Sequence, residues 1–176
     1  MSNYYFITSK LNGYVLDIEG NNTAPATPII NYPRKSTGTD NQLWLREPTG
    51  PKDPSGGQSQ YFIKSKLNNY VLDITGNSPT PRTQIISYPQ KTSNTNNQVW
   101  QIIESSVEGY FYIVSLLNGY VLDVEGGSTT ARTPIISFPQ NSPTSDNQLW
   151  KFVDSGSSSG KKSGMSGKKS GISAKL

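Results

Sequence analysis

The sequence predicts an all-β protein, a closed barrel built from three internal repeats of four short strands each. Three observations lead to this prediction. A segment of roughly 40 residues occurs three times with unchanged internal spacing. The turn-favouring residues Gly, Pro, Ser, Thr and Asn are abundant, and charged residues make up only 16% of the 176 residues. This composition is typical of short strands joined by polar turns and disfavours a helical architecture.

Each repeat carries three motifs in the same order. A run Leu-Asn-Gly-Tyr-Val-Leu-Asp, with Asn in place of Gly in the second copy, is followed by Ile-Ile-x-Tyr-Pro, with Phe in place of Tyr in the third. A closing Asn-Gln-Leu/Val-Trp ends at a tryptophan that lies 27 residues after the aspartate in every copy. Internal triplication explains this constant spacing. The aspartate and tryptophan pairs are Asp17 and Trp44, Asp73 and Trp100, and Asp123 and Trp150.

Turn signals and apolar alternation divide each copy into four short strands. In the first copy these are expected at about 5–9, 14–19, 28–32 and 42–46. Four strands per repeat also describe a propeller blade, but propellers usually need at least four blades to close. A three-fold barrel of about twelve strands is therefore the better prediction.

The chain is expected to form one domain followed by a tail. The domain spans residues 1–154, with repeats at about 1–47, 58–104 and 107–154. Residues 155–176 are almost wholly Gly, Ser and Lys and are expected to be flexible and disordered. The tail holds five lysines and no acid, so the rest of a chain of net charge +4 carries about −1. No specific nucleic-acid partner is therefore expected, although weak contact of the tail with a polyanion or membrane surface stays open.

Several residue types are missing, and their absence limits the chemistry. Without His or Cys there is no Ser-His-Asp or Cys-His arrangement, no zinc site of the usual kind and no disulfide. No cofactor or metal is expected. The N-terminus does not resemble a signal peptide, and no run of 18 apolar residues predicts a transmembrane segment. We therefore expect a protein that is cytoplasmic as synthesised.

Side-chain alternation along the strands predicts which motif residues meet at the surface. In the second strand, Leu16 faces the core and Asp17 points outward. In the third, Tyr32 joins the outward group, and in the fourth Trp44 is the core residue while Asn41 points outward. A carboxylate, an aromatic ring and an amide that converge suit a sugar, because the polar groups bind hydroxyls and the ring covers the apolar pyranose face.

Three Gln-x-Trp motifs, each with a Leu-Asp pair at fixed spacing upstream, make the chain resemble the ricin B-chain type β-trefoil lectins. The Ile-Ile-x-Tyr-Pro and Asp-Asn-Gln-Leu-Trp segments look most like the mushroom lectins of that family. The resemblance implies a β-trefoil with up to three glycan sites for galactose or N-acetylgalactosamine, which act by multivalent binding to glycoproteins or glycolipids without enzymatic activity. A protein of this kind would act on external glycans after its release from the cell. The glutamines share the tryptophan face and are expected mainly to hold backbone groups. The implied sugar-binding residues are Asp17, Tyr32, Asn41 and Gln42 in the first repeat, Asp73, Tyr88, Asn97 and Gln98 in the second, and Asp123, Phe138, Asn147 and Gln148 in the third.

The three pockets are expected to differ from one another. Phe138 lacks the phenolic hydroxyl of its counterparts, and Thr75 stands where the other copies have a glutamate. Arg82 and Arg132 precede the third strand of their repeats, where the first copy has Ala26. An arginine near the pocket would favour an acidic glycan. As a solvated loop charge it would have no such role.

Two other functions stay open. Asp17 with Glu19, and Asp123 with Glu125, lie about 7 Å apart as i and i+2 on a strand and would suit a glycosidase, although the second copy lacks the second acid. A β-trefoil protease inhibitor or protein-interaction module would use exposed loops instead. Such a protein would not need the same aspartate, aromatic ring and asparagine in every repeat. Association as a homodimer is compatible with the sequence.

Overall fold

The computed structural model describes residues 3–50 and 59–156, which form twelve β-strands and six short 3₁₀ turns, with no α-helix. Nearly all of the predicted tail lies outside the described residues, as does most of the segment that joins the first two repeats. No helix in the described part of the chain is long and apolar enough to cross a membrane. The strands are β1 (Tyr5–Ser9), β2 (Val15–Ile18), β3 (Thr27–Tyr32), β4 (Trp44–Pro48), β5 (Gln60–Ser65), β6 (Val71–Ile74), β7 (Thr83–Tyr88), β8 (Val99–Glu104), β9 (Phe111–Ser115), β10 (Val121–Val124), β11 (Thr133–Phe138) and β12 (Trp150–Asp154).

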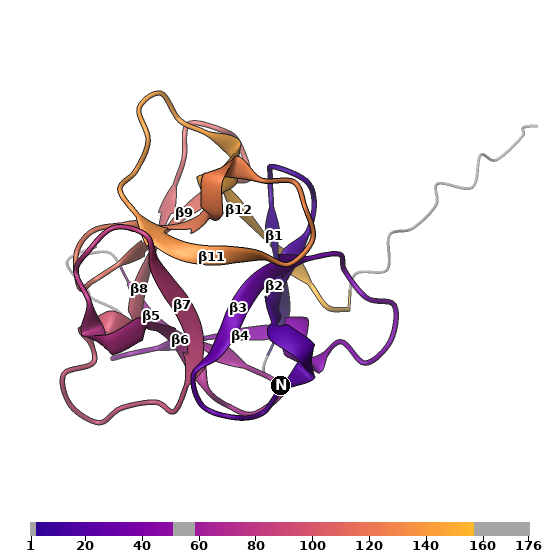
Figure 1. The fold of residues 1–176 in the computed structure, drawn as a ribbon, viewed down its shortest axis with the longest axis vertical. Helices are drawn as coiled ribbons and strands as arrows, with labels where there is room; N and C mark the ends of the chain where they lie inside the picture. Colours follow the sequence, from indigo (N-terminus) through magenta and orange to yellow (C-terminus); the bar gives the residue numbers. More distant parts are fainter. Residues whose placement is uncertain (1–2, 51–58, 157–176) are drawn as a thin grey trace, which may run out of the picture.

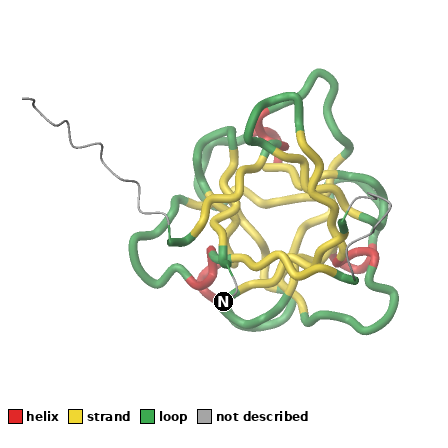
Figure 2. Tube along the Cα trace, turned by 180° about the vertical axis from the view of Figure 1, so that it is seen from behind, coloured by secondary structure: helices red, strands yellow, loops and turns green. Residues whose placement is uncertain are grey.

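Six of these strands close a barrel. The long antiparallel pairs are β1 with β12, β4 with β5 and β8 with β9, and each of them joins two different repeats. Shorter pairings within a repeat, β1 with β4, β5 with β8 and β9 with β12, complete the ring. Seen from behind in Figure 2, the strands surround a central axis. Closure leaves the barrel without an unpaired edge strand.

The other six strands form three hairpins that cap the barrel. They are β2–β3, β6–β7 and β10–β11, one in each repeat. Their second strands, β3, β7 and β11, pair with one another around the centre of the molecule, and the hairpins lie in three lobes (Figure 1). The molecule is therefore a β-trefoil, as the triplication predicts.

One tryptophan per repeat anchors the apolar core. Trp44 is buried beside Leu16, Ile18 and Ile29, and its indole Nε1 donates a hydrogen bond to the Leu16 carbonyl at 3.1 Å. The equivalent bonds in the second and third repeats measure 3.2 and 3.0 Å. A buried indole N–H needs an acceptor, so this bond is part of what makes the residue fit. It joins the fourth strand to the residue directly before the motif aspartate.

A single residue breaks the three-fold symmetry at the centre of the cap. Gln84 occupies in β7 the position that Pro28 holds in β3 and Pro134 holds in β11. Its Nε2 donates to three equivalent isoleucine carbonyls, one from each repeat, at distances of 2.9 to 3.1 Å. The side chain thereby links all three repeats at one point.

The fourth strand of the first repeat begins two residues later than the sequence predicts. Asp40–Gln42 form a 3₁₀ turn, and β4 starts at Trp44. The assignment of Asn41 and Gln42 to opposite faces of a strand is therefore wrong, because side chains in a 3₁₀ turn do not alternate. Both amides point toward Asp17 instead.

Candidate functional site

In the first repeat, two amides of the 3₁₀ turn hold the carboxylate of Asp17 on β2. Asn41 Nδ2 donates to Asp17 Oδ1 at 2.8 Å, and Gln42 Nε2 donates to Oδ2 at 2.8 Å. The same two nitrogens also donate to the carbonyls of Ile18 and Pro33, each at 2.9 Å. The expectation that the glutamine holds backbone groups is thus confirmed, and the glutamine supports the carboxylate as well.

A lysine completes the first cluster. Lys35 Nζ donates to Asn41 Oδ1 at 2.9 Å and lies 3.5 Å from Asp17 Oδ2. The backbone N–H of Lys35 donates to Gln42 Oε1 at 2.9 Å. Lysine, asparagine and aspartate therefore form a closed chain of charge-assisted contacts.

The second repeat reproduces this arrangement. Asp73 accepts from Asn97 Nδ2 at 2.9 Å and from Gln98 Nε2 at 2.8 Å. Lys91 Nζ donates to Asn97 Oδ1 at 2.9 Å and lies 3.6 Å from Asp73 Oδ2. The agreement between two repeats of different sequence indicates that the cluster is a property of the motif.

The third repeat differs because Asn141 stands where the others have the lysine. Gln148 Nε2 donates to Asp123 Oδ2 at 2.7 Å and holds the turn in the same way. Asn147 Nδ2 donates to the Val124 carbonyl at 3.3 Å. Asn141 turns toward its own loop and donates to a serine hydroxyl at 2.8 Å. Within residues 3–50 and 59–156, no lysine forms an ion pair with Asp123.

The three aspartates are less exposed than the sequence predicts. They lie on the strand face opposite Leu16 and its counterparts, as alternation requires, but Asp17 and Asp73 are only 2% exposed and Asp123 only 3%. The prediction of an outward, solvent-exposed carboxylate is therefore wrong in degree. The amides of the 3₁₀ turn cover each carboxylate, and they also supply the hydrogen bonds that a buried charge requires.

This burial changes the acidity of the three groups. Burial raises the pKa of Asp17 and of Asp73 above the ordinary value of 3.8, against the opposing effect of the amide hydrogen bonds and the lysine charge. Burial also raises the pKa of Asp123. There the neighbouring amides and Arg82 oppose the rise, while Glu125 adds to it.

Each arginine of the preceding loops lies at the pocket of a neighbouring repeat. Arg132 of the third repeat donates to Glu19 of the first at 2.6 Å, and Arg82 of the second donates to Glu125 of the third at 3.2 Å. Arg132 has a left-handed backbone with φ of 71°, and its N–H donates to the Asn31 carbonyl of the first repeat at 2.9 Å. The loop is therefore docked on the adjacent repeat, and the arginine is not a free loop charge.

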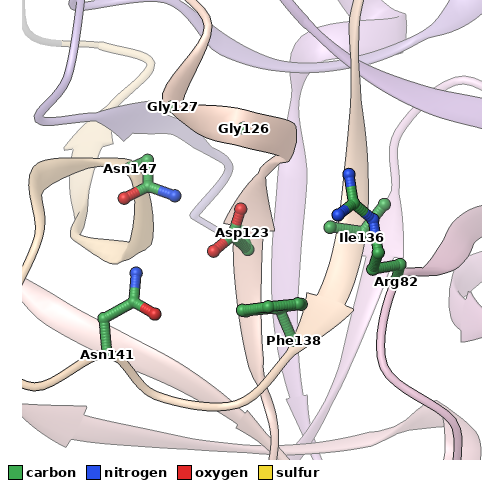
Figure 3. A pocket seen from close by; sticks show the side chains of 8 residues that line it. All are labelled: Arg82, Asp123, Gly126, Gly127, Ile136, Phe138, Asn141 and Asn147. Carbon is green, nitrogen blue, oxygen red and sulfur yellow. The ribbon is translucent and has the colours of Figure 1, made fainter.

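In the third repeat, the motif aspartate Asp123 lines a hollow at the surface. Its volume is about 270 Å³. In Figure 3 the ring of Phe138 lies beside the Asp123 carboxylate, with Asn141 and Asn147 on one side and Arg82 on the other. The structure thus brings together the predicted aspartate, ring and asparagine of this repeat and adds a residue from the second repeat.

The hollows of the other two repeats are different. In the first repeat, Asp17, Tyr32, Lys35 and Arg132 line a space of about 120 Å³. In the second repeat, the hollow beside Lys91 has a volume of about 550 Å³, but neither Asp73 nor Tyr88 lines it. Tyr88 is 37% exposed. This hollow is therefore formed by the loops of the second repeat and not by its aspartate and ring.

The arrangement can bind hydroxyl groups but does not present a pair of free catalytic carboxylates. Glu19 and Glu125, the second acids of the glycosidase hypothesis, are each paired with an arginine. Among the described residues, no group of three or more acidic side chains could hold a metal ion.

Two features of the site were not predicted from the sequence, although both left a signal: the lysine of the first two pockets, and the contact of each arginine with a neighbouring repeat. The lysine position holds Lys35, Lys91 and Asn141 in the three repeats. In every repeat it lies nine residues before the motif tryptophan. The arginine column varies together with the glutamate column of the next lobe, and this covariation indicates contact between repeats. The matched positions are Arg132 with Glu19, Arg82 with Glu125, and Ala26 with Thr75.

The chain was compared with known families and structures. The model of the family described as ricin-type β-trefoil lectin domain-like matches residues 1–88, 52–138 and 96–162. The chain belongs to this family. The resemblance deduced from the three Gln-x-Trp motifs is therefore confirmed. No curated protein matches the chain in sequence.

Several solved structures resemble the chain over most of its length. The designed three-fold symmetric protein ThreeFoil is 27% identical with a TM-score of 0.74, and the match covers 86% of this chain and 98% of that protein. The C-terminal half of the earthworm R-type lectin, solved with GalNAc, is 30% identical with a TM-score of 0.62 and coverage of 86% and 98%. The ricin B-like lectin of the mushroom Macrolepiota procera, solved with lactose, is 25% identical with a TM-score of 0.66 and coverage of 85% and 94%.

Proposed function

We propose that this protein is a non-enzymatic lectin for glycans that contain galactose or N-acetylgalactosamine. One observation carries the proposal. In the third repeat, a buried carboxylate, an aromatic ring and two asparagines line a single hollow of about 270 Å³. Such a hollow combines hydrogen-bond acceptors for neighbouring hydroxyls with a flat apolar surface for the C–H face of a pyranose.

The sugar class is supported by the relatives. The earthworm lectin half was solved with GalNAc and the mushroom lectin with lactose, a disaccharide that contains galactose. Both share the fold of this chain. In our proposal the Asp123 carboxylate accepts hydrogen bonds from two adjacent sugar hydroxyls, Phe138 stacks on the ring, and Asn147 supplies a further polar contact. Up to three such pockets act together on a glycan-covered surface, where single-site affinities near millimolar are sufficient.

Calorimetric titration with lactose and with GalNAc tests the proposal. The triple variant Asp17→Asn, Asp73→Asn and Asp123→Asn keeps the size of each side chain and removes the charge, so binding should fall at least tenfold. Glu47→Gln is the control, because it also replaces a carboxylate by an amide of the same size, and Glu47 pairs with Lys64 on the barrel strands β4 and β5. Heat of binding that is unchanged in the triple variant would refute the assignment of the site.

The other expected function, a protease inhibitor or protein-interaction module, predicts the opposite pattern. Inhibition of a protease by the unmodified protein that persists in the triple variant would support it. Such a result, together with no heat of binding for any galactose-containing sugar, would replace the lectin proposal.

A further inference from the structure

The three junctions at which one repeat meets the next share the same backbone contact. At each junction, the residue that follows a barrel strand donates its N–H to a carbonyl of the neighbouring repeat. Lys10 donates to the Leu149 carbonyl, Lys66 to the Leu43 carbonyl and Leu116 to the Val99 carbonyl, each at 2.9 Å. The three positions are therefore equivalent, and their side chains can be compared directly.

The side chains at these positions close two junctions and leave the third without an ion pair. Lys10 Nζ lies 2.7 Å from Asp146 Oδ1, and Lys66 Nζ lies 2.8 Å from Asp40 Oδ1. At the junction of the second and third repeats, the lysine is replaced by Leu116 and the aspartate by Asn96. Exposed ion pairs contribute little to stability, so the fold tolerates the loss of one.

A hollow of about 550 Å³ lies at this junction. Its volume is within the range of ligand pockets, which is roughly 300 to 1,000 Å³. Five of its lining residues come from loops of the second repeat and one comes from the third: Asn77, Lys91, Asn94, Thr95, Asn96 and Leu117. The hollow is thus found at the junction that lacks the ion pair of the other two.

The lining of this hollow suits a neutral ligand with many hydroxyl groups. It contains three carboxamides and one hydroxyl, and Lys91 carries its only charge. A carboxamide both donates and accepts hydrogen bonds, as a sugar hydroxyl does. Among the described residues, none forms a hydrogen bond with the side chain of Asn77, Asn94 or Asn96, so the three amides are free to bind a ligand.

Lys91 connects the hollow to the motif aspartate of the second repeat. Its Nζ lies 3.6 Å from Asp73 Oδ2 and donates to Asn97 Oδ1 at 2.9 Å, and the same side chain lines the hollow. The polar cluster at Asp73 and the amides of the hollow are therefore separated by a single side chain. A glycan whose terminal sugar is at Asp73 can extend past Lys91 into the hollow.

We propose that the hollow at the junction of the second and third repeats is a subsite for the inner sugar units of a galactose-terminated oligosaccharide whose terminal sugar binds at Asp73. The proposal rests on the proposed lectin function and extends it from a single sugar to a longer chain. It assigns this extension to the second repeat alone, because only its junction has Asn96 and Leu116 in place of the aspartate and lysine.

The protein contains a natural probe for each repeat. Trp44, Trp100 and Trp150 each donate the indole N–H to the carbonyl of the residue directly before the motif aspartate. A two-dimensional ¹H–¹⁵N NMR spectrum of the full-length chain then shows one indole signal per repeat, and single Trp→Phe variants assign them. Titrations with lactose and with an unbranched tetrasaccharide of two N-acetyllactosamine units follow the occupancy of each repeat separately.

The tetrasaccharide should shift the Trp100 signal at concentrations at least tenfold lower than lactose does. For Trp44 and Trp150 the two sugars should differ by less than threefold, because only their terminal units make contact there. Asn94→Gly should reduce the advantage at Trp100 at least threefold. This change removes one amide without straining the backbone, since Asn94 has φ of 51° and Gly38 holds the equivalent position in the first repeat.

A double variant closes the junction in the way that the protein itself closes the other two. Asn96→Asp with Leu116→Lys restores the residues that form an ion pair at those junctions, so both changes are compatible with the fold. This variant should lose the advantage of the tetrasaccharide at Trp100 and keep the response to lactose. Glu47→Gln with Lys64→Leu is the control, because it alters a lysine–carboxylate pair on the barrel strands β4 and β5, and it should leave the advantage unchanged.

Two kinds of result would overturn the inference, and they can be distinguished. If lactose binds but the tetrasaccharide has no larger advantage at Trp100 than at the other two indoles, or if the advantage persists in the closed double variant, only the inference fails. If no indole responds to lactose, GalNAc or the tetrasaccharide, the proposed lectin function fails and the inference fails with it.

Discussion

Replacing Asn31 by serine should stabilise this protein. Asn31 on β3 is fully buried, and neither its Nδ2 nor its Oδ1 has a hydrogen-bond partner. The Nδ2 of Asn12 is also buried without a partner. The other two repeats have a serine at this place, and its hydroxyl accepts a bond from the asparagine that corresponds to Asn12, at 3.4 and 3.3 Å. The first repeat alone departs from this pairing.

The magnitude follows from the number of unpaired atoms. A buried polar group without a partner costs about 1–3 kcal/mol, and Asn31→Ser removes two such groups and gives Asn12 an acceptor. The smaller side chain loses about 1–2 kcal/mol of packing. We expect the free energy of unfolding to rise by about 2 kcal/mol, or the melting temperature by about 4–8 °C for a domain of this size.

Urea unfolding followed by tryptophan fluorescence measures this change. The reverse exchange supplies the control, because Ser137→Asn should create the same unpaired amide in the third repeat and lower the stability. The reasoning would be refuted if Asn31→Ser destabilised the protein while Ser137→Asn did not. That outcome would mean that Asn31 has a hydrogen-bond partner, such as an ordered water, in solution.

Three further predictions concern the pockets. Burial raises the pKa of Asp123, so the folded chain binds this proton more tightly than the unfolded chain. As the pH falls, sugar affinity measured by titration calorimetry should be lost with a midpoint above 3.8, while the carboxyl's contribution to the free energy of unfolding should increase. A midpoint below 3.8 would contradict the shift. Arg82→Ala should alter lactose affinity at the third pocket, although the residue belongs to the second repeat, and the Trp150 indole signal should report the change while Trp44 does not. Gln98→Leu should lower the free energy of unfolding by about 3 kcal/mol or more, because it removes a hydrogen bond to the buried Asp73 carboxylate. Gln101→Leu in β8 is the control. Equal effects of the two changes in urea unfolding would argue against the role of the amide.

The sequence predicts this fold well because the signals that define it are local and repeated. Alternation along β2 and β3 assigns Leu16 to the core and places Asp17 and Tyr32 on the other face, and triplication then fixes the architecture. The fourth strand was misjudged because Asn41 and Gln42 have side chains compatible with either a strand or a turn. Only the bonds that both make to Asp17, 24 and 25 residues away, show that the chain turns there.

The composition of each pocket was harder to predict because it depends on contacts made by loops, some of them between repeats. Lys35 is near its aspartate only through the loop after β3, and Arg132 reaches Glu19 across 113 residues. Such contacts have no periodicity along the chain. An alignment of the three copies contains signs of these contacts. They are visible only when the residues of each loop are compared with those of the neighbouring repeat as well as with those of its own repeat.

Gln84 shows how one departure from exact triplication can serve all three repeats. A rotation axis is a line, and side chains that point toward it from symmetry-related positions would all meet on it at the same level. Three glutamines would crowd one another, and three prolines would leave the converging isoleucine carbonyls without the donor that Gln84 Nε2 supplies. One odd residue on the axis resolves the conflict. A protein built from three identical copies of any one repeat would therefore lack this arrangement, in which a single amide bonds to a carbonyl of every repeat.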